Sequence, residues 1–231
     1  GFAIIALAWV ACPGTGLAGE PWDLRHWSFL PVKPQQLPEV QDESWPRTRV
    51  DYFILARIEA AGRKPAPQAD AGVLVPRQGF DLVGLPPDPS LQLDPSRLPD
   101  HLLASPHFGE RWARHWLDVA RYAESSGNTR NMAYVLAWKY RNYVVRAFNR
   151  DVPFDQFIRE QIAGDLLPAA TPSERDEQLL ATGFLNVGTR SLGEQDLLLY
   201  EMNLADDLID TTCHAFLALS ANCARCHDHK F

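Results

Sequence analysis

The residues Ser105–Tyr122, SPHFGERWARHWLDVARY, contain the clearest helix signal in the chain. Ser105 followed by Pro106 is a typical helix start, because a serine side chain caps free backbone amides and proline fits the first turn. Apolar residues then recur at helical spacing, with Trp112 and Trp116 one turn apart. The stretch predicts an amphipathic helix with an aromatic inner face.

Helical periodicity recurs through most of the remaining chain. Residues 48–51 resemble a capping box, and Gly62 provides a natural helix end. Residues 63–100 are rich in proline and glycine and predict no regular element. Strand-like alternation is almost absent, so the fold class is mainly α: an irregular multi-helix domain preceded by a Pro/Trp-rich extended arm. Helices are predicted over 48–62, 105–122, 132–149, 153–162, 173–185 and 194–220.

The first residues are read as a targeting segment. Residues 1–19 resemble a partial signal peptide, because the eleven-residue apolar run Phe2–Cys12 is followed by helix breakers and small residues. A bilayer span needs about 20 apolar residues, so no stable membrane span is expected. Lipidation of Cys12, giving a lipid anchor, is the alternative to simple cleavage. The protein is expected to be exported, periplasmic or otherwise extracytoplasmic.

The rest of the chain divides into an arm and a domain. Residues 20–47 contain five prolines among three tryptophans, which excludes a continuous helix and favours an extended arm. Residues 48–231 form the helical domain. That domain is expected to be truncated at its C-terminus, because only four residues follow its most distinctive motif.

Composition excludes several classes of function. The 231 residues carry 22 Lys+Arg against 29 Asp+Glu, a net charge of -7, without a basic run, so no nucleic-acid partner is expected. The chain also lacks a serine nucleophile elbow, a phosphate-binding glycine loop and a dinucleotide fingerprint. These absences leave hydrolase and nucleotide-enzyme functions without support.

The motif that carries chemistry is Cys223-Ala224-Arg225-Cys226-His227. This C-x-x-C-H pattern is typical of covalent haem c attachment. Two thiols three residues apart on a helical turn share a face, where they can add to the two vinyl groups of haem. The imidazole of His227 can then bind the haem iron from one side. The pattern predicts a c-type haem protein in electron transfer or haem-dependent redox chemistry.

Zinc is the alternative cofactor, and a redox or structural cysteine pair is a further alternative. Cys213, Cys223, Cys226 and His229 would supply the four sulfur and nitrogen ligands that zinc prefers. In that case the chain would be a zinc-stabilised structural or interaction domain without catalysis. A second C-x-x-C, which would strengthen the zinc interpretation, is absent from the sequence.

Two further constellations are candidates for function. Asp206, Asp210 and His214 recur every four residues on one helix face, a spacing that could direct them at one metal or substrate. A solvated acidic stripe is the favoured interpretation. His115, with Asp118 one turn on, could be an acid–base group or a haem ligand, whereas an internal hydrogen-bonded contact is favoured.

The sixth position of a haem iron has several upstream candidates. His115, His214 and Met132 could be brought close by folding. Met202 would lie roughly 30 Å from the motif if one unbroken helix joined them, since each residue adds about 1.5 Å. Histidine ligation or an open position is therefore predicted in preference to methionine.

The sequence resembles the exported planctomycete cytochrome C-like proteins, specifically their second conserved domain, a domain of unknown function. The resemblance implies an exported, haem-bearing protein whose partners are a redox protein or further domains of the precursor; the family does not define a reaction. Pro76 and Gly79 depart from it, standing where the family usually has Arg and Thr. The resemblance covers about residues 26–231, in the blocks 26–29, 50–54, 80–87, 102–122, 148–149, 153–154, 160–168, 181–184 and 223–231.

Overall fold

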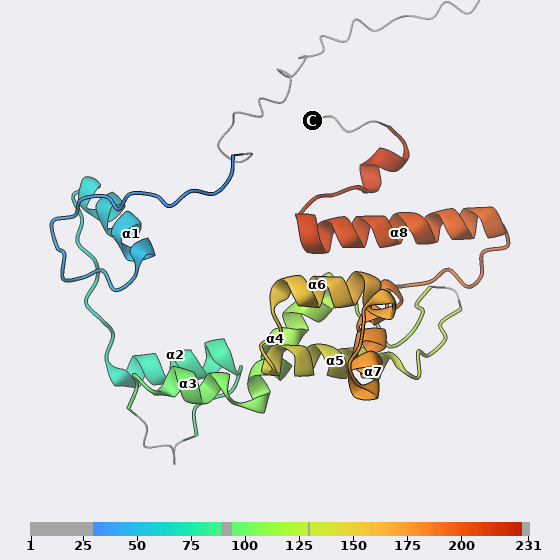
Figure 1. The fold of residues 1–231 in the computed structure, drawn as a ribbon, viewed down its shortest axis with the longest axis horizontal. Coiled ribbons are helices and arrows are strands. Elements are labelled where there is room, and N and C mark those ends of the chain that lie inside the picture. Colours follow the sequence, from blue (N-terminus) through green and yellow to red (C-terminus); the bar gives the residue numbers. More distant parts are fainter. Residues whose placement is uncertain (1–29, 89–93, 129, 228–231) are drawn as a thin grey trace, which may run out of the picture. The chain divides into compact units, whose positions relative to one another are not determined.

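The computed structural model describes residues 30–88, 94–128 and 130–227. These residues fall into two compact units, which divide after Pro67. The arm unit comprises residues 30–67, and the helical body comprises the described residues from Gln68 onward. Within the described parts there are eight α-helices and a single isolated β-bridge, so the predicted mainly α fold class is confirmed (Figure 1).

The arm unit contains one helix, α1 (Arg49–Ala60). Thr48 and Asp51 form the predicted capping box at its start, and Gly62 follows its end with a φ of 68°, a conformation that suits glycine. Residues 30–47, the described part of the predicted arm, contain no helix. The backbone amides of Gln41 and Asp42 donate hydrogen bonds of 2.9 and 3.1 Å to the Glu59 carboxylate, which ties this segment to α1.

The helical body begins with α2 (Ala71–Leu82), where the sequence predicts no regular element. Asp70 caps the helix by accepting a hydrogen bond from the Val73 amide, which compensates in part for Pro76 inside the helix. A Cβ at Gly79 would lie 2.8 Å from the Leu85 carbonyl oxygen. Glycine therefore lets the loop after α2 fold back onto the helix.

Helix α3 (Leu98–Leu103) was not predicted either, and two of the predicted helices differ from the sequence pattern in their bounds. The helix predicted from residue 132 starts only at Ala137, because Ser125 bridges to Ala133 and the Tyr134 amide donates to the Glu124 carbonyl. The helix predicted to reach residue 220 ends at Leu217. The body contains α3 (Leu98–Leu103), α4 (Pro106–Val119), α5 (Ala137–Asn149), α6 (Phe154–Ala163), η2 (Gly164–Leu166), α7 (Pro172–Ala181), η3 (Thr182–Leu185), α8 (Leu197–Leu217) and η4 (Asn222–Arg225).

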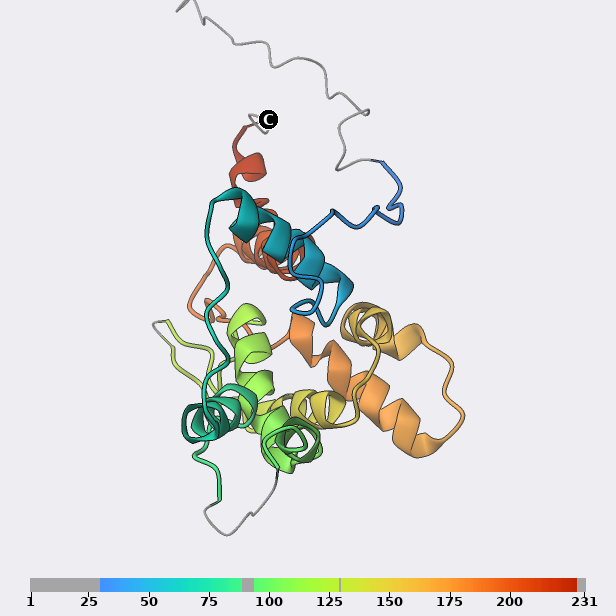
Figure 2. The ribbon, with the colours of Figure 1, turned by 90° about the vertical axis from the view of Figure 1, so that its left-hand side faces the viewer.

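The main core lies where α4, α5, α6 and η3 meet (Figure 1, Figure 2). Trp116 of α4 is at its centre, and its ring contacts Phe157, Phe184 and Phe216, with centroids 4.9, 5.8 and 5.6 Å away. Phe216 belongs to α8, so this aromatic cluster also fastens α8 to the core. A smaller apolar cluster joins α2 and α3 to Phe108 of α4.

Four buried polar side chains of this core form hydrogen bonds with one another or with the Trp116 indole. The Trp116 indole donates to the Tyr140 hydroxyl at 2.9 Å, and that hydroxyl donates to the Gln161 side-chain oxygen at 2.7 Å. The Tyr143 hydroxyl donates to the Glu160 carboxylate at 2.7 Å. Burial raises the pKa of both tyrosines above the ordinary range, so both hydroxyls stay protonated and able to donate.

Helices α4 and α5 approach closely at a glycine. The Gly109 amide donates to the Asn149 side-chain oxygen at 2.7 Å, and the Asn149 side-chain nitrogen donates to the Pro106 carbonyl at 3.1 Å. Asn149 of α5 thus caps the first turn of α4. A Cβ at Gly109 would lie 2.6 Å from Asn149 and closer still to the Val145 carbonyl oxygen, so this crossing requires glycine.

Replacing Gly109 with alanine should therefore destabilise the helical body. We expect Gly109→Ala to lower the free energy of unfolding by about 1–3 kcal/mol, the usual cost of forcing an extra methyl group into a packed site. Urea unfolding followed by circular dichroism measures the change. Gly72→Ala is the control, because a Cβ there meets only the Asp70 side chain at 3.2 Å. Equal midpoints for the two variants would contradict the close-approach argument.

Candidate functional site

The C-x-x-C-H motif lies on a short turn that folds back beside α8. Helix α8 ends at Leu217, and Ala218 adopts a left-handed conformation with a φ of 54°. The chain then reverses and enters the 3-10 helix η4, which lies next to α8 (Figure 1). The predicted helical turn is therefore present, but it is separate from the long helix.

The three residues per turn of a 3-10 helix determine which side chains share an edge of η4. Arg225 lies on the edge that faces α8, as the contacts of its side chain with Asn203 and Asp206 show. Cys223 lies in η4 and Cys226 directly follows it, and their spacing of three residues is the one that places side chains on a shared edge. Both cysteines and His227 are exposed to solvent. The turn therefore presents its two thiols together, away from the edge that is attached to α8.

Asp210 of α8 holds the start of this turn. One of its carboxylate oxygens accepts hydrogen bonds from the Ala221 amide at 3.0 Å and from the Asn222 amide at 2.9 Å. These two amides open η4 and lack intrahelical partners, so the carboxylate acts as a cap supplied by another helix. A carboxylate that accepts from backbone amides makes a stronger contact than a neutral acceptor does.

Arg225, inside the motif, holds the other end of the turn to the same helix. Its guanidinium donates to the Asn203 side-chain oxygen at 2.7 Å and pairs with the Asp206 carboxylate at 2.7 Å. Both side chains of the ion pair are about two-thirds or more buried, at 33% and 27% exposure, so solvent screens the pair less than a surface pair. The two ends of η4 are thus fixed at separate points of α8.

His214 joins the same network through both nitrogens of its ring. Its Nδ1 lies 3.4 Å from the Asp210 carboxylate and its Nε2 lies 3.2 Å from the Ser220 hydroxyl. The Asp210–His214–Ser220 chain therefore joins α8 to the reversal that follows it.

These contacts change the interpretation of the acidic residues on α8. The sequence favours a solvated acidic stripe, whereas Asp206 and Asp210 are largely buried against the motif turn and bonded to it. The neighbouring Asp207 pairs with Arg121 at the end of α4. Asn203 was not singled out from the sequence, although its spacing of three and seven residues from Asp206 and Asp210 places it on the same helix face.

No metal centre is formed by the residues that the structure describes. Among them, no three His, Cys, Asp or Glu side chains come together in a way that could hold a metal ion. Cys213, Cys223 and Cys226 are free thiols, and Cys213 is half-buried on α8. His229, the fourth member of the predicted zinc set, lies outside the described residues.

The other predicted residues lie elsewhere on the body. His115 and Asp118 are both exposed on α4, and the His115 ring packs on Trp112 with centroids 5.5 Å apart. The favoured internal hydrogen bond of His115 is therefore wrong, because the side chain points out of the core. The distance argument against Met202 also fails, because the reversal brings Arg225 back to Asn203, the next residue along α8.

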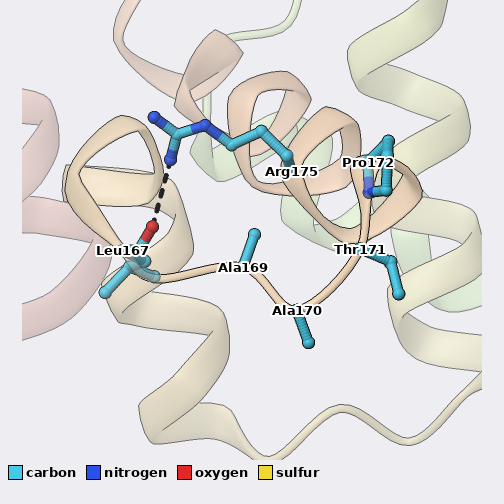
Figure 3. Close-up of a pocket in the computed structure, with 6 residues that line it drawn as sticks. All are labelled: Leu167, Ala169, Ala170, Thr171, Pro172 and Arg175. Atoms are coloured by element: carbon cyan, nitrogen blue, oxygen red, sulfur yellow. Dashed lines mark hydrogen bonds between the residues drawn. The ribbon is translucent and has the colours of Figure 1, made fainter.

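A surface depression of about 430 Å³ lies at the start of α7, far along the chain from the motif (Figure 3). It is lined by Leu167, Ala169, Ala170, Thr171, Pro172 and Arg175. Arg175, its one charged side chain, donates to the carbonyls of Asp165 at 2.7 Å and Leu167 at 3.0 Å. The guanidinium therefore closes the end of the preceding helix and is not directed at a ligand.

No helix in the described part of the chain is both long enough and apolar enough to cross a bilayer.

Comparison with known protein families matches residues 49–231 to the family PSCyt2, described as a protein of unknown function (DUF1549). No curated protein and no solved structure shows a significant match to the chain. The family match covers well over half of the chain and includes α1, the helical body and the C-x-x-C-H turn. The chain therefore belongs to PSCyt2, the second domain of the planctomycete cytochrome C-like proteins.

Proposed function

We propose that this protein is an exported c-type haem-binding protein that acts in electron transfer or haem-dependent redox chemistry. Cys223 and Cys226 attach the haem and His227 binds its iron. The observation that carries the proposal is the pair of free, exposed thiols on one edge of a fixed turn, followed directly by an exposed imidazole.

The donor set suits covalent haem attachment. Each thiol adds its S–H across one vinyl double bond, so that a C–S and a C–H bond form and neither an oxidant nor a leaving group is needed. The 3-10 turn supports this chemistry, because residues three apart eclipse one another and keep the two sulfur atoms on one side. Bound haem would supply one-electron redox chemistry, and His227 would be a ligand of its iron.

Export is part of the same proposal. Covalent haem attachment takes place outside the cytoplasm, and the predicted signal peptide at residues 1–19 would bring the chain there. Those residues lie outside the described part of the chain. The agreement between an export signal at one end of the sequence and a C-x-x-C-H motif at the other supports extracytoplasmic localisation. A redox protein, or further domains of the precursor, would exchange electrons with the haem.

Wild-type protein should carry covalent haem when it is exported in cells that also express the haem-attachment machinery. We expect the haem stain to stay with the denatured polypeptide on a gel, and a pyridine haemochrome spectrum to give about one haem per chain, since the sequence has one C-x-x-C-H motif. Metal analysis of the same sample measures zinc. Stoichiometric zinc without haem would replace the proposal with the zinc-stabilised structural domain.

A further inference from the structure

We infer that Asp210 and Asp206 are positioning residues that shape the C-x-x-C-H turn before haem is attached. The inference rests on the proposed function, and it adds the device that makes the two thiols available. The 3-10 helix η4 is very short, with four residues. A helix of this length is not stable alone, because helix nucleation costs more than one turn of hydrogen bonds returns.

Asp210 provides the missing stabilisation at the start of the turn. Its side chain is 24% exposed, and one carboxylate oxygen accepts hydrogen bonds from two of the amides that η4 leaves unpaired. Its other oxygen faces His214, which is bonded in turn to Ser220 in the reversal. The carboxylate thus fixes the direction in which the chain leaves the reversal, and with it the place where Cys223 begins the motif.

Asp206 fixes the rotation of the turn about its own axis. Because η4 has three residues per turn, the side chain that contacts α8 determines which edges remain free. Arg225 is that side chain, held by Asp206 and Asn203. A rotation by one residue would direct either the cysteine edge or the His227 edge at α8. The ion pair therefore keeps both thiols and the imidazole exposed at the same time.

Asp210→Ala tests the inference, with Asp210→Asn as the conservative variant and Glu201→Ala as the control. The amide oxygen of asparagine can still accept from the two backbone amides, whereas alanine cannot. Glu201 is exposed on the same helix, and its replacement by alanine removes the same single negative charge. Two quantities are measured: covalent haem per chain, and hydrogen exchange of the Ala221 and Asn222 amides in haem-free protein.

In Asp210→Ala we expect the Ala221 and Asn222 amides to exchange their hydrogens about tenfold faster, since hydrogen bonds to charged groups are among the stronger ones. We also expect this variant to carry several-fold less covalent haem. Asp210→Asn should retain most of both properties, and Glu201→Ala should match wild type. The melting temperature of each variant, from circular dichroism, shows that the body has folded.

Three results would overturn the inference. Asp210→Ala could attach haem as well as wild type does, or it could lose haem without faster exchange of the two amides, or Asp210→Asn could be as defective as Asp210→Ala. In each case wild-type protein carries haem, so the proposed function stands while the positioning role falls. Wild-type protein without haem contradicts the proposed function itself, and the positioning role falls with it.

Discussion

Cys223→Ser/Cys226→Ser should carry no covalently bound haem under conditions in which wild-type protein is fully loaded. A serine hydroxyl does not form the thioether, and the two cysteines are the one C-x-x-C pair in the sequence. Neither cysteine is buried, so the substitutions leave the core intact and the loss should be complete. Haem staining of denatured protein and its intact mass measure the result.

His227→Ala is the matched control for the cysteine variant. It removes the iron ligand and leaves both thiols, so part of the haem should stay attached while its absorption spectrum changes, because the thioethers and the iron ligand are separate contacts. A cysteine double variant that still holds haem through denaturation would place the attachment elsewhere. An unchanged spectrum for His227→Ala would show that the His227 imidazole does not bind the iron.

Trp116→Ala should cost about 3–5 kcal/mol of unfolding free energy, the usual range for deleting a buried tryptophan. The indole contacts three phenylalanine rings contributed by α6, η3 and α8, so its loss opens a cavity where these elements meet. The Tyr140 hydroxyl also loses the hydrogen bond that it accepts from the indole. Chemical unfolding followed by tryptophan fluorescence and circular dichroism measures the loss.

Trp112→Ala is the control for this prediction, since Trp112 lies one turn earlier on α4 and is 37% exposed. Its substitution should lower the free energy of unfolding much less, because a partly exposed ring buries less apolar surface on folding. Similar losses for the two tryptophans would show that the cluster around Trp116 is not the centre of the core.

The helices were predictable where local signals and packing agree. Ser105 and Pro106 begin α4 as expected, because capping depends only on neighbouring residues. Helix α2 was missed because Pro76 argues against a helix, and the compensating contacts of Asp70 and Gly79 become visible only in three dimensions. The early start predicted for α5 failed because residues 132–136 bond across the chain to residues 124–126.

The candidate site was half predictable. The C-x-x-C-H motif can be read directly, because its spacing is dictated by the chemistry of attachment. Its support on α8 could not be read, since the reversal depends on Ala218 in a left-handed conformation that alanine rarely adopts. Without the reversal, Asp206 and Asp210 are surface acids; with it, they become partners of the motif.

The attachment of η4 to a single helix has a mechanical consequence. Asp210, Asp206 and Asn203, which hold the two ends of the turn, all belong to α8, and α8 is joined to the rest of the body by contacts that include Phe216 and the Asp207–Arg121 ion pair. Helix α8 and the turn therefore form one structural unit, which is attached to the body beside the aromatic cluster. If α8 moved, the two cysteines would move with it, and the spacing between them would stay the same.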